Sequence, residues 1–396
     1  MNTILIGNTE VDLNTYNTEK TKNKYITTFE GINTVNNTLT FKYFISSVDG
    51  LRLEIVGDTD RTFIVEFYEP DGNLFYQTKL STNMWTQLSR KYFTPWRYVI
   101  TDEESNQIIC DEIFSLKNKK VYISFESKSL GDTIAWIPYC EEFRKKHDCE
   151  LVVSTFWNKF FIENYTNIKF VNPGSVVYDI TAQYRLGWFE DFNKEPEKPN
   201  LIPLQKAASN ILGLDFTEIK PEITYPDIKP FDFKYVTIAT HSTAGLKYWN
   251  HPNGWEELVS FIKSKGYEVV HVSMEKTELD GVIQLEDTSI ENTMSVINGS
   301  ELFIGLSSGL SWLSWAIGKH VVMISNFTES DHEFTSNCTR ITNPDSCNGC
   351  WNNPLFKFDK GDWYWCPEHK GTNRHFECHK SITPEMVISK VNKLLQ

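Results

Sequence analysis

The chain has 396 residues, which is long enough for two or three domains with separate hydrophobic cores. Its formal net charge is −13, from 52 acidic and 39 basic side chains, and this balance argues against nucleic acid or an anionic membrane surface as a partner. No stretch approaches the roughly 20 apolar residues of a membrane-spanning helix, and the first ten residues lack the basic start of a signal peptide. We therefore expect a cytoplasmic protein without membrane insertion.

The first part of the chain, residues 1–117, is predicted to be an all-β domain. Apolar and polar residues alternate with a period of two in Thr38–Ile45, Leu51–Val56 and Thr62–Tyr68. The third of these runs leads into Glu69-Pro-Asp-Gly72, a turn sequence. Short strands joined by turns predict a small sandwich or barrel.

Strands and helices alternate after residue 118, which predicts parallel sheets with crossover helices. The predicted buried strands are Lys120–Phe125, Cys149–Ser154, Tyr235–Ala239, Glu268–Ser273, Leu302–Gly305 and Val321–Ser325. A proline-rich connector over residues 193–203 divides this region into two Rossmann-like halves, 118–203 and 204–337. A helix over about 204–213 is predicted to open the second half, with Gly213 ending it.

Gly131 and Asp132 fall where the first strand of the first half passes into its helix, the place where open α/β sheets bind ligands. Gly131 would let the backbone approach a ligand closely. Asp132 would face the crevice at the helix start, where a carboxylate can act as a general base. The alternative, that Asp132 only caps the helix, stays open.

The second half contains two loops suited to an anion. Ser242 and Thr243 can donate hydrogen bonds and Lys247 can neutralise charge, a combination that predicts a diphosphate site. Ser307-Ser308-Gly309 opens a helix whose first amides favour an anion. A Gly/Ser turn before a helix is usually only a turn, but together with the Gly131 loop these segments share one edge of a paired α/β architecture.

Four of the eight cysteines lie close together near the C-terminus, at Cys347, Cys350, Cys366 and Cys378. The C-x2-C pair puts two sulfurs on one tight turn, relieved sterically by Gly349, and two later thiolates can complete a tetrahedron around zinc or iron. Two disulfides remain the alternative. We predict a metal module at 338–381, followed by a C-terminal helix at 382–396 that begins with Thr383 and Pro384.

The loops resemble those of the family 9 glycosyltransferases, the lipopolysaccharide heptosyltransferases. That family shows an S-L-G-D-x-x-x-x-x-P segment, an (S/T)-x-x-x-x-K-x-W segment and a D-T-G-L-S-H segment. The corresponding segments here are Ser129-Leu-Gly-Asp132 with Pro138, Ser242-Thr243 with Lys247 and Trp249, and Ser307-Ser-Gly-Leu-Ser-Trp312. Three positions depart from the family. Its Asp and His in the third segment are Ser307 and Trp312, and its usual His after Gly-Asp is Ala135, so a contact to the sugar is missing or replaced.

The β domain and the four cysteines look like the Aah/TibC group of bacterial autotransporter protein O-heptosyltransferases, whose iron finger carries cysteines at the same spacing. The resemblance implies an α/β fold of the GT-B type, the donor ADP-glycero-manno-heptose, and serine acceptors on an autotransporter passenger protein. It also implies one structural iron with zinc as the alternative, no catalytic divalent metal, and a large homo-oligomer.

On this resemblance, Asp132 would be the general base of an inverting transfer and Lys247 would stabilise the leaving diphosphate. The residues expected to hold the donor are Gly131, Ser242, Thr243, Lys247, Glu275, Ser308, Gly309, Leu310 and Ser311. Two rival functions stay open. One is a transferase of the same fold acting on lipopolysaccharide or another glycan with a different nucleotide sugar. The other is a non-catalytic module in which the cysteine cluster binds a partner protein.

Overall fold

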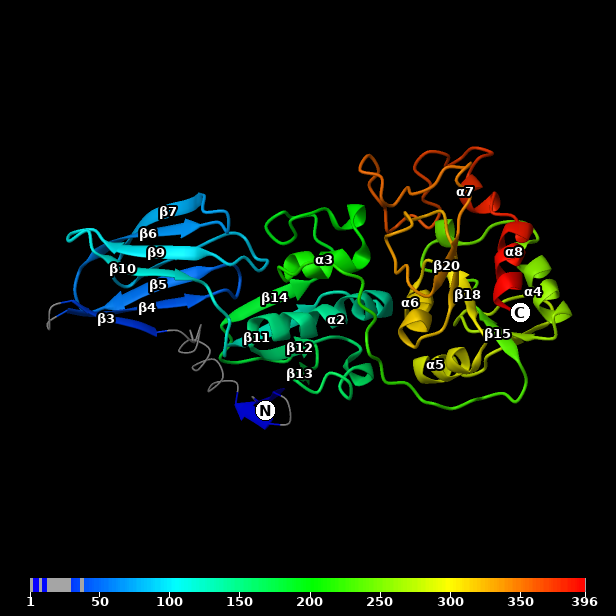
Figure 1. Ribbon diagram of the computed structural model, residues 1–396, viewed down its shortest axis with the longest axis horizontal. Coiled ribbons are helices and arrows are strands. Elements are labelled where there is room, and N and C mark those ends of the chain that lie inside the picture. Colours follow the sequence, from blue (N-terminus) through cyan, green and yellow to red (C-terminus); the bar gives the residue numbers. More distant parts are fainter. Residues whose placement is uncertain (1–2, 7–8, 13–29, 36–38, 396) are drawn as a thin grey trace.

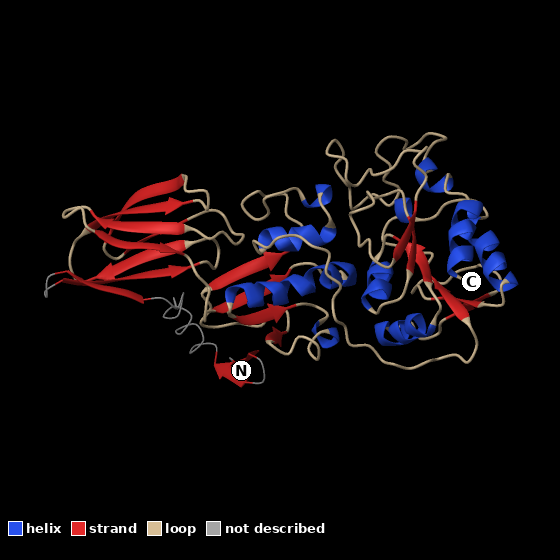
Figure 2. Ribbon diagram, in the orientation of Figure 1, coloured by secondary structure: helices blue, strands red, loops and turns tan. Residues whose placement is uncertain are grey.

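The computed structural model describes residues 3–6, 9–12, 30–35 and 39–395. Three units follow one another along the long axis of the molecule: an N-terminal β unit, a first α/β unit and a second α/β unit (Figure 1). Figure 2 shows that the first unit consists of strands and loops, whereas helices flank the strands of the other two. Within the described residues, no helix combines the length and apolar character needed to cross a bilayer.

The β unit contains two four-stranded antiparallel sheets, with strand orders β10-β9-β6-β7 and β3-β4-β5-β8. Their strands are β3 (Glu30–Val35), β4 (Leu39–Ser46), β5 (Arg52–Gly57), β6 (Thr62–Tyr68), β7 (Leu74–Ser81), β8 (Met84–Gln87), β9 (Arg97–Asp102) and β10 (Ile108–Ile113). Phe41 on one sheet and Phe63 on the other pack with ring centroids 4.8 Å apart, so the unit is a sandwich. Buried residues alternate along β6, which confirms the predicted period of two. A separate hairpin joins β1 (Thr3–Ile6) to β2 (Thr9–Asp12), and the rest of the predicted 1–117 domain before β3 lies outside the described residues.

The first α/β unit has a four-stranded parallel sheet in the order β13-β12-β11-β14. Its elements are β11 (Lys120–Phe125), α2 (Leu130–His147), β12 (Glu150–Ser154), η1 (Asn158–Phe160), β13 (Ile168–Val171), β14 (Ala182–Leu186), η2 (Pro199–Leu201) and α3 (Leu204–Ile211). Buried residues line most of α2, including Pro138 inside it. The helix is therefore embedded in the protein and holds its N-terminal end in a fixed position.

Helix α3 follows the proline-rich connector but packs against α2 and β14 of the first unit. Trp136 on α2 donates from Nε1 to the carbonyl of Leu204 at 2.8 Å, which ties the two helices together. Gly213 ends this segment with φ +61°, as predicted for a C-terminal glycine. The second half was predicted to begin at residue 204, and from these contacts we propose that the boundary falls after α3.

The second α/β unit has a six-stranded parallel sheet in the order β17-β16-β15-β18-β19-β20. Its strands and helices are β15 (Tyr235–Ile238), η3 (Gly245–Lys247), α4 (Gly254–Ser264), β16 (Glu268–His271), β17 (Val282–Gln284), α5 (Ile290–Gly299), β18 (Phe303–Leu306), α6 (Gly309–Ala316), β19 (Val321–Ile324), β20 (Cys338–Ile341), α7 (Glu377–Lys380) and α8 (Pro384–Leu394). The predicted metal module at 338–381 thus begins with a strand of this sheet. Helix α8 packs on α4, and the Thr383 hydroxyl accepts from the amide of Met386 at its start, as its capping sequence predicts.

The two α/β units meet where α2 and α6 begin. A Cβ atom on Gly131 would lie 3.2 Å from the Cα of Gly309 and 3.3 Å from the Trp312 ring. Glycine at 131 therefore permits a close backbone approach between the units. Both helix starts follow the carboxyl ends of parallel strands, so the loops that carry the predicted site converge on this junction.

Candidate active site

Asp132 lies in the first turn of α2, in the unit that follows the β sandwich. Ser129 is the N-cap residue of the helix, and its side chain accepts a hydrogen bond from the Asp132 amide. The Asp132 carboxylate accepts hydrogen bonds from the Ser127 hydroxyl at 2.5 Å and from Nε1 of Trp188 at 2.9 Å. Burial raises the pKa of Asp132 above its ordinary value, and the two hydrogen bonds offset part of this effect. Ser129, and not Asp132, therefore caps the helix, and the Asp132 carboxylate is held by two hydrogen-bond donors.

Lys247 lies on the loop after β15 in the other α/β unit, with Nζ 5.2 Å from the centre of the Phe327 ring. Burial lowers the pKa of Lys247, while the nearby charges of Glu333 and Asp132 raise it. Asp132 and Lys247 are therefore close enough to interact electrostatically, although they come from separate sheets. The structure brings together the two residues predicted to be catalytic.

A buried carboxylate that the sequence analysis missed, Glu333, lies on the loop after β19. It pairs with Arg340 at 2.7 Å and accepts hydrogen bonds from the hydroxyls of Ser307 and Thr328. Burial by itself would raise its pKa, but the charge of Arg340 and the other contacts outweigh burial and lower the pKa of Glu333 to about 2. Ser307 thus replaces the family aspartate with a hydroxyl that contacts a carboxylate from elsewhere in the chain. No local motif marks Glu333, because only the fold places it beside Ser307 and Lys247.

We expect Glu333→Gln to lower the free energy of unfolding by about 3–5 kcal/mol, because it leaves the buried Arg340 charge without its partner. Urea denaturation at neutral pH measures this loss. The matched control is Glu142→Gln, whose ion pair with Lys145 is exposed and should contribute less than about 1 kcal/mol. Because the pKa of Glu333 is depressed, its contribution is fully present above pH 4.5 and is lost as the pH falls toward 2. Equal losses in both variants would contradict the assignment.

Three serine hydroxyls follow neighbouring strands of the second sheet and have no hydrogen-bond partner among the described residues. Ser242, Ser273 and Ser308 come after β15, β16 and β18, and their hydroxyl oxygens are buried. Buried hydroxyls in proteins are normally paired, so these three are suited to a polar ligand at the carboxyl edge of the sheet. Ser242 and Ser308 were predicted donor contacts, and Ser273 was missed because a serine after a strand carries no distinctive pattern.

The other residues predicted to contact the nucleotide sugar differ in their exposure and in their hydrogen bonds. Thr243 and Glu275 are exposed on the loops after β15 and β16. Gly309 and Leu310 begin α6, where the first amides of a helix lack intrahelical partners. Ser311 is fully buried and its hydroxyl donates to the carbonyl of Leu306 at 2.5 Å. The Ser311 hydroxyl is therefore used in a hydrogen bond at the start of the helix. The prediction that this residue contacts the nucleotide sugar is wrong for the hydroxyl.

The four clustered cysteines line one cavity beside the second sheet. The turn between Cys347 and Cys350 needs glycine, because Gly349 has φ +63° and a Cβ there would lie 2.1 Å from Oε1 of Glu329. All eight cysteines of the chain are free, against the disulfide alternative. Four cysteine side chains thus line one cavity, and thiolate sulfur is a ligand type that structural zinc and iron take in proteins.

One cysteine has a defined hydrogen-bond donor from outside the set. His379 accepts the backbone N–H of Asn326 at Nε2, at 3.2 Å, so its proton is on Nδ1. That Nδ1 lies 3.2 Å from the sulfur of Cys378 and can donate to it. A donor of this kind orients and stabilises a ligating thiolate.

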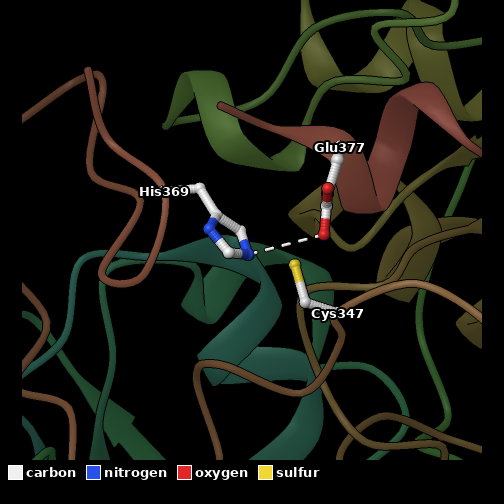
Figure 3. Close-up of side chains that lie close together, drawn as sticks. All are labelled: Cys347, His369 and Glu377. Atoms are coloured by element: carbon white, nitrogen blue, oxygen red, sulfur yellow. Dashed lines mark ion pairs between the residues drawn. The ribbon is translucent and has the colours of Figure 1, made fainter. Parts of the chain in front are cut away.

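Cys347 also lies near His369 and Glu377, with the three possible ligand atoms within 4.8 Å of one another (Figure 3). The carboxylate of Glu377 lies 3.4 Å from Nε2 of His369 and accepts two hydrogen bonds from Arg374, at 2.6 and 2.5 Å. Because Arg374 already balances its charge, we interpret His369 and Glu377 as surroundings of Cys347 and not as a competing ligand set.

Residues 204–362 match the model of glycosyltransferase family 9 (heptosyltransferase). The autotransporter heptosyltransferase Aah of Escherichia coli is 34% identical over 346 residues, covering 82% of this chain and 87% of that protein. The inactive autotransporter heptosyltransferase BimC of Burkholderia thailandensis is 32% identical, covering 86% of this chain and 82% of its own length.

Among solved structures, the dodecameric iron-containing heptosyltransferase TibC of enterotoxigenic E. coli, in complex with ADP-D-β-D-heptose, superposes with a TM-score of 0.79 at 30% identity. The match covers 89% of this chain and 96% of TibC. With a curated relative above 30% identity over most of both chains, this chain belongs to the autotransporter heptosyltransferases, a family of enzymes that transfer heptose.

Proposed function

We propose that this protein is an inverting GT-B enzyme that transfers heptose from ADP-glycero-manno-heptose to serine side chains of an autotransporter adhesin. The observation that carries the proposal is that Asp132 and Lys247, from the two α/β units, lie near enough for the charge of each to shift the pKa of the other. A base and a cation at one junction are what a displacement with an anionic leaving group requires. The complex of TibC with ADP-D-β-D-heptose supports the choice of donor.

The reaction would proceed in one displacement. The serine hydroxyl attacks the anomeric carbon from the face opposite ADP, Asp132 accepts the hydroxyl proton, and the bond from the anomeric carbon to the diphosphate oxygen breaks with its electron pair. Serine is a poor nucleophile at neutral pH, so a positioned base is needed. A single displacement inverts the anomeric configuration.

Charge develops on the departing diphosphate as the bond breaks. Lys247 and the first amides of α6, from Gly309 and Leu310, would stabilise that charge. The unpaired hydroxyls of Ser242, Ser273 and Ser308 would hold the nucleotide at the edge of the sheet. These groups would supply the electrostatic stabilisation that a catalytic divalent metal provides in other transferases.

Mass spectrometry of an autotransporter passenger protein co-expressed with this chain tests the proposal. We expect a mass increase of one heptosyl group per modified serine, and none with Asp132→Asn. Transfer to a purified lipid acceptor but not to the passenger would favour the lipopolysaccharide alternative. Because BimC is inactive although it is 32% identical, the experiment also decides whether this chain is catalytically competent.

We propose further that Cys347, Cys350, Cys366 and Cys378 hold one structural iron, with no position open to substrate. The iron-containing TibC supports iron over zinc. We expect Cys366→Ser to lose most of the bound metal, measured by elemental analysis, and to lower the melting temperature. The control is Cys338→Ser, because Cys338 lies on β20 outside the cavity. Full metal content in Cys366→Ser would exclude the four-cysteine site.

We also place the protein in the cytoplasm as a large homo-oligomer. None of the eight cysteines forms a disulfide in the described residues, as expected in a reducing compartment. The dodecameric state of TibC supports assembly, as do Leu355 and Tyr364 in the cysteine module, which are 85% and 59% exposed. Light scattering of the purified protein checks the oligomeric state.

A further inference from the structure

The cysteine module, which we define as residues 342–381, reaches across to the first α/β unit. Its loops stand beside the second unit on the side toward α3 (Figure 1). The Asn200 side chain, on η2, donates to the carbonyl of Trp351 at 3.0 Å, and the Asn352 side chain donates to the carbonyl of Asn200 at 2.8 Å. Trp351 and Asn352, which follow Cys350, therefore form hydrogen bonds with a segment of the first α/β unit.

Aromatic contacts connect Trp351 to the carboxylate of Asp132. The ring of Trp351 packs edge-on against Trp188, with centroids 5.5 Å apart and planes at 86°. Nε1 of Trp188 donates to Asp132. His332 stacks on Trp188 at 6.5 Å and meets Trp351 at 6.0 Å, which closes the cluster from a third side.

Trp351 acts in this cluster by packing and not through its indole N–H. That nitrogen is buried and has no hydrogen-bond partner among the described residues. Phe327 and Phe358 contact the same ring, with centroids 5.5 and 5.2 Å away. An aromatic ring of similar shape should therefore serve at position 351, and an aliphatic side chain should not.

The immediate partners of Asp132 are the hydrogen-bond donors Ser127 and Trp188. The positive charges of Lys247 and Lys360 lower the pKa of Asp132, against the larger effect of burial. Both lysines are therefore kept in every variant of the test.

We propose that the cysteine module forms a third wall of the active site, in which Trp351 holds Trp188 against Asp132. Trp351 is a positioning residue in this scheme, since it acts on the base through Trp188 and touches no reacting atom. The inference rests on the proposed role of Asp132 as the base.

The test follows the ionisation of Asp132 with and without turnover. Because an indole N–H donates to the carboxylate, protein fluorescence should titrate with Asp132, and the component that disappears in Asp132→Asn identifies it. We expect Trp351→Leu to move this titration, and the acid limb of the kcat/KM profile, upward by roughly one pH unit, which is about a tenfold loss on the acid side. Trp351→Phe should restore the profile.

Trp85→Phe is the control, because Trp85 is half exposed on β8 of the sandwich and distant along the fold from this cluster. An unchanged fluorescence titration in Trp351→Leu would overturn the inference, as would a rate loss without a shift in the profile. Asn352→Ala removes a hydrogen bond that holds the module on η2, so it should shift the titration in the same direction and tests the inference even if Trp351→Leu folds poorly. If Asp132→Asn keeps full transfer activity but Trp351→Leu still shifts the fluorescence titration, Trp351 does act on Asp132. In that case the proposed role of Asp132 as the base is wrong.

Discussion

Asp132→Asn is expected to lower the turnover of heptose transfer by about 10²–10⁴-fold, because an amide cannot accept the serine proton. The substitution keeps the size of the side chain and one oxygen for the Ser127 and Trp188 donors. The fold and the donor affinity should therefore change little. The rate of ADP release in the presence of acceptor protein measures turnover, and calorimetry measures ADP affinity.

Asp58→Asn is the matched control, since Asp58 is an exposed carboxylate after β5 of the sandwich and should leave turnover unchanged. Near-normal transfer by Asp132→Asn would remove this carboxylate from the mechanism. A loss of ADP affinity equal to the loss of turnover would instead indicate a disturbed site and not a missing base.

Lys247→Ala should lower turnover by about 10²–10³-fold, the usual effect of removing one group that stabilises developing charge. It should also weaken ADP binding, because the proposed role of the ammonium group is to neutralise the diphosphate. Calorimetric titration with ADP gives the affinity and the ADP-release assay gives the rate. Lys117→Ala, at an exposed lysine before β11, is the control and should change neither.

The same titration separates an enzyme from a non-catalytic binding module. A module that acts only through its cysteine cluster predicts no ADP binding by the unmodified protein. Saturable binding that weakens in Lys247→Ala would exclude that rival, and the absence of binding would exclude the transferase.

The two residues also predict a bell-shaped pH dependence. Asp132 must be ionised, so activity should fall as the pH drops through a pKa raised above the ordinary aspartate value. Lys247 must be protonated, so activity should fall as the pH rises through a pKa lowered from that of ordinary lysine. Asp132→Asn should abolish the acid limb and Lys247→Ala the basic limb.

Local patterns were sufficient for much of the architecture. Period-two alternation predicted strands such as β6, and the strand–helix alternation predicted two parallel sheets. Turn and capping chemistry acts over a few residues, so Gly213, Gly349 and Thr383 could be interpreted without a structure. The motif around Asp132 could be found for the same reason, because it follows a strand and opens a helix.

Boundaries between units were harder to predict. The helix α3 has no feature in its own sequence that says which sheet it packs on, and only its contacts with α2 and β14 assign it to the first unit. The structure places Cys338, the first residue of the segment predicted to be the metal module, in the strand β20. The sequence could not show this, because a cysteine is compatible with both a strand and a metal site.

The sequence by itself determined the family, the strand pattern, the helix that carries Asp132, and the four cysteines, since each is written in contiguous residues or fixed spacings. The tertiary structure alone decided that Glu333 lies beside Ser307, that Trp188 donates to Asp132, and that Trp351 of the cysteine module packs on Trp188. These contacts join residues that are 26, 56 and 163 positions apart along the chain. Such pairs form through burial and packing of whole units, and no local propensity encodes them.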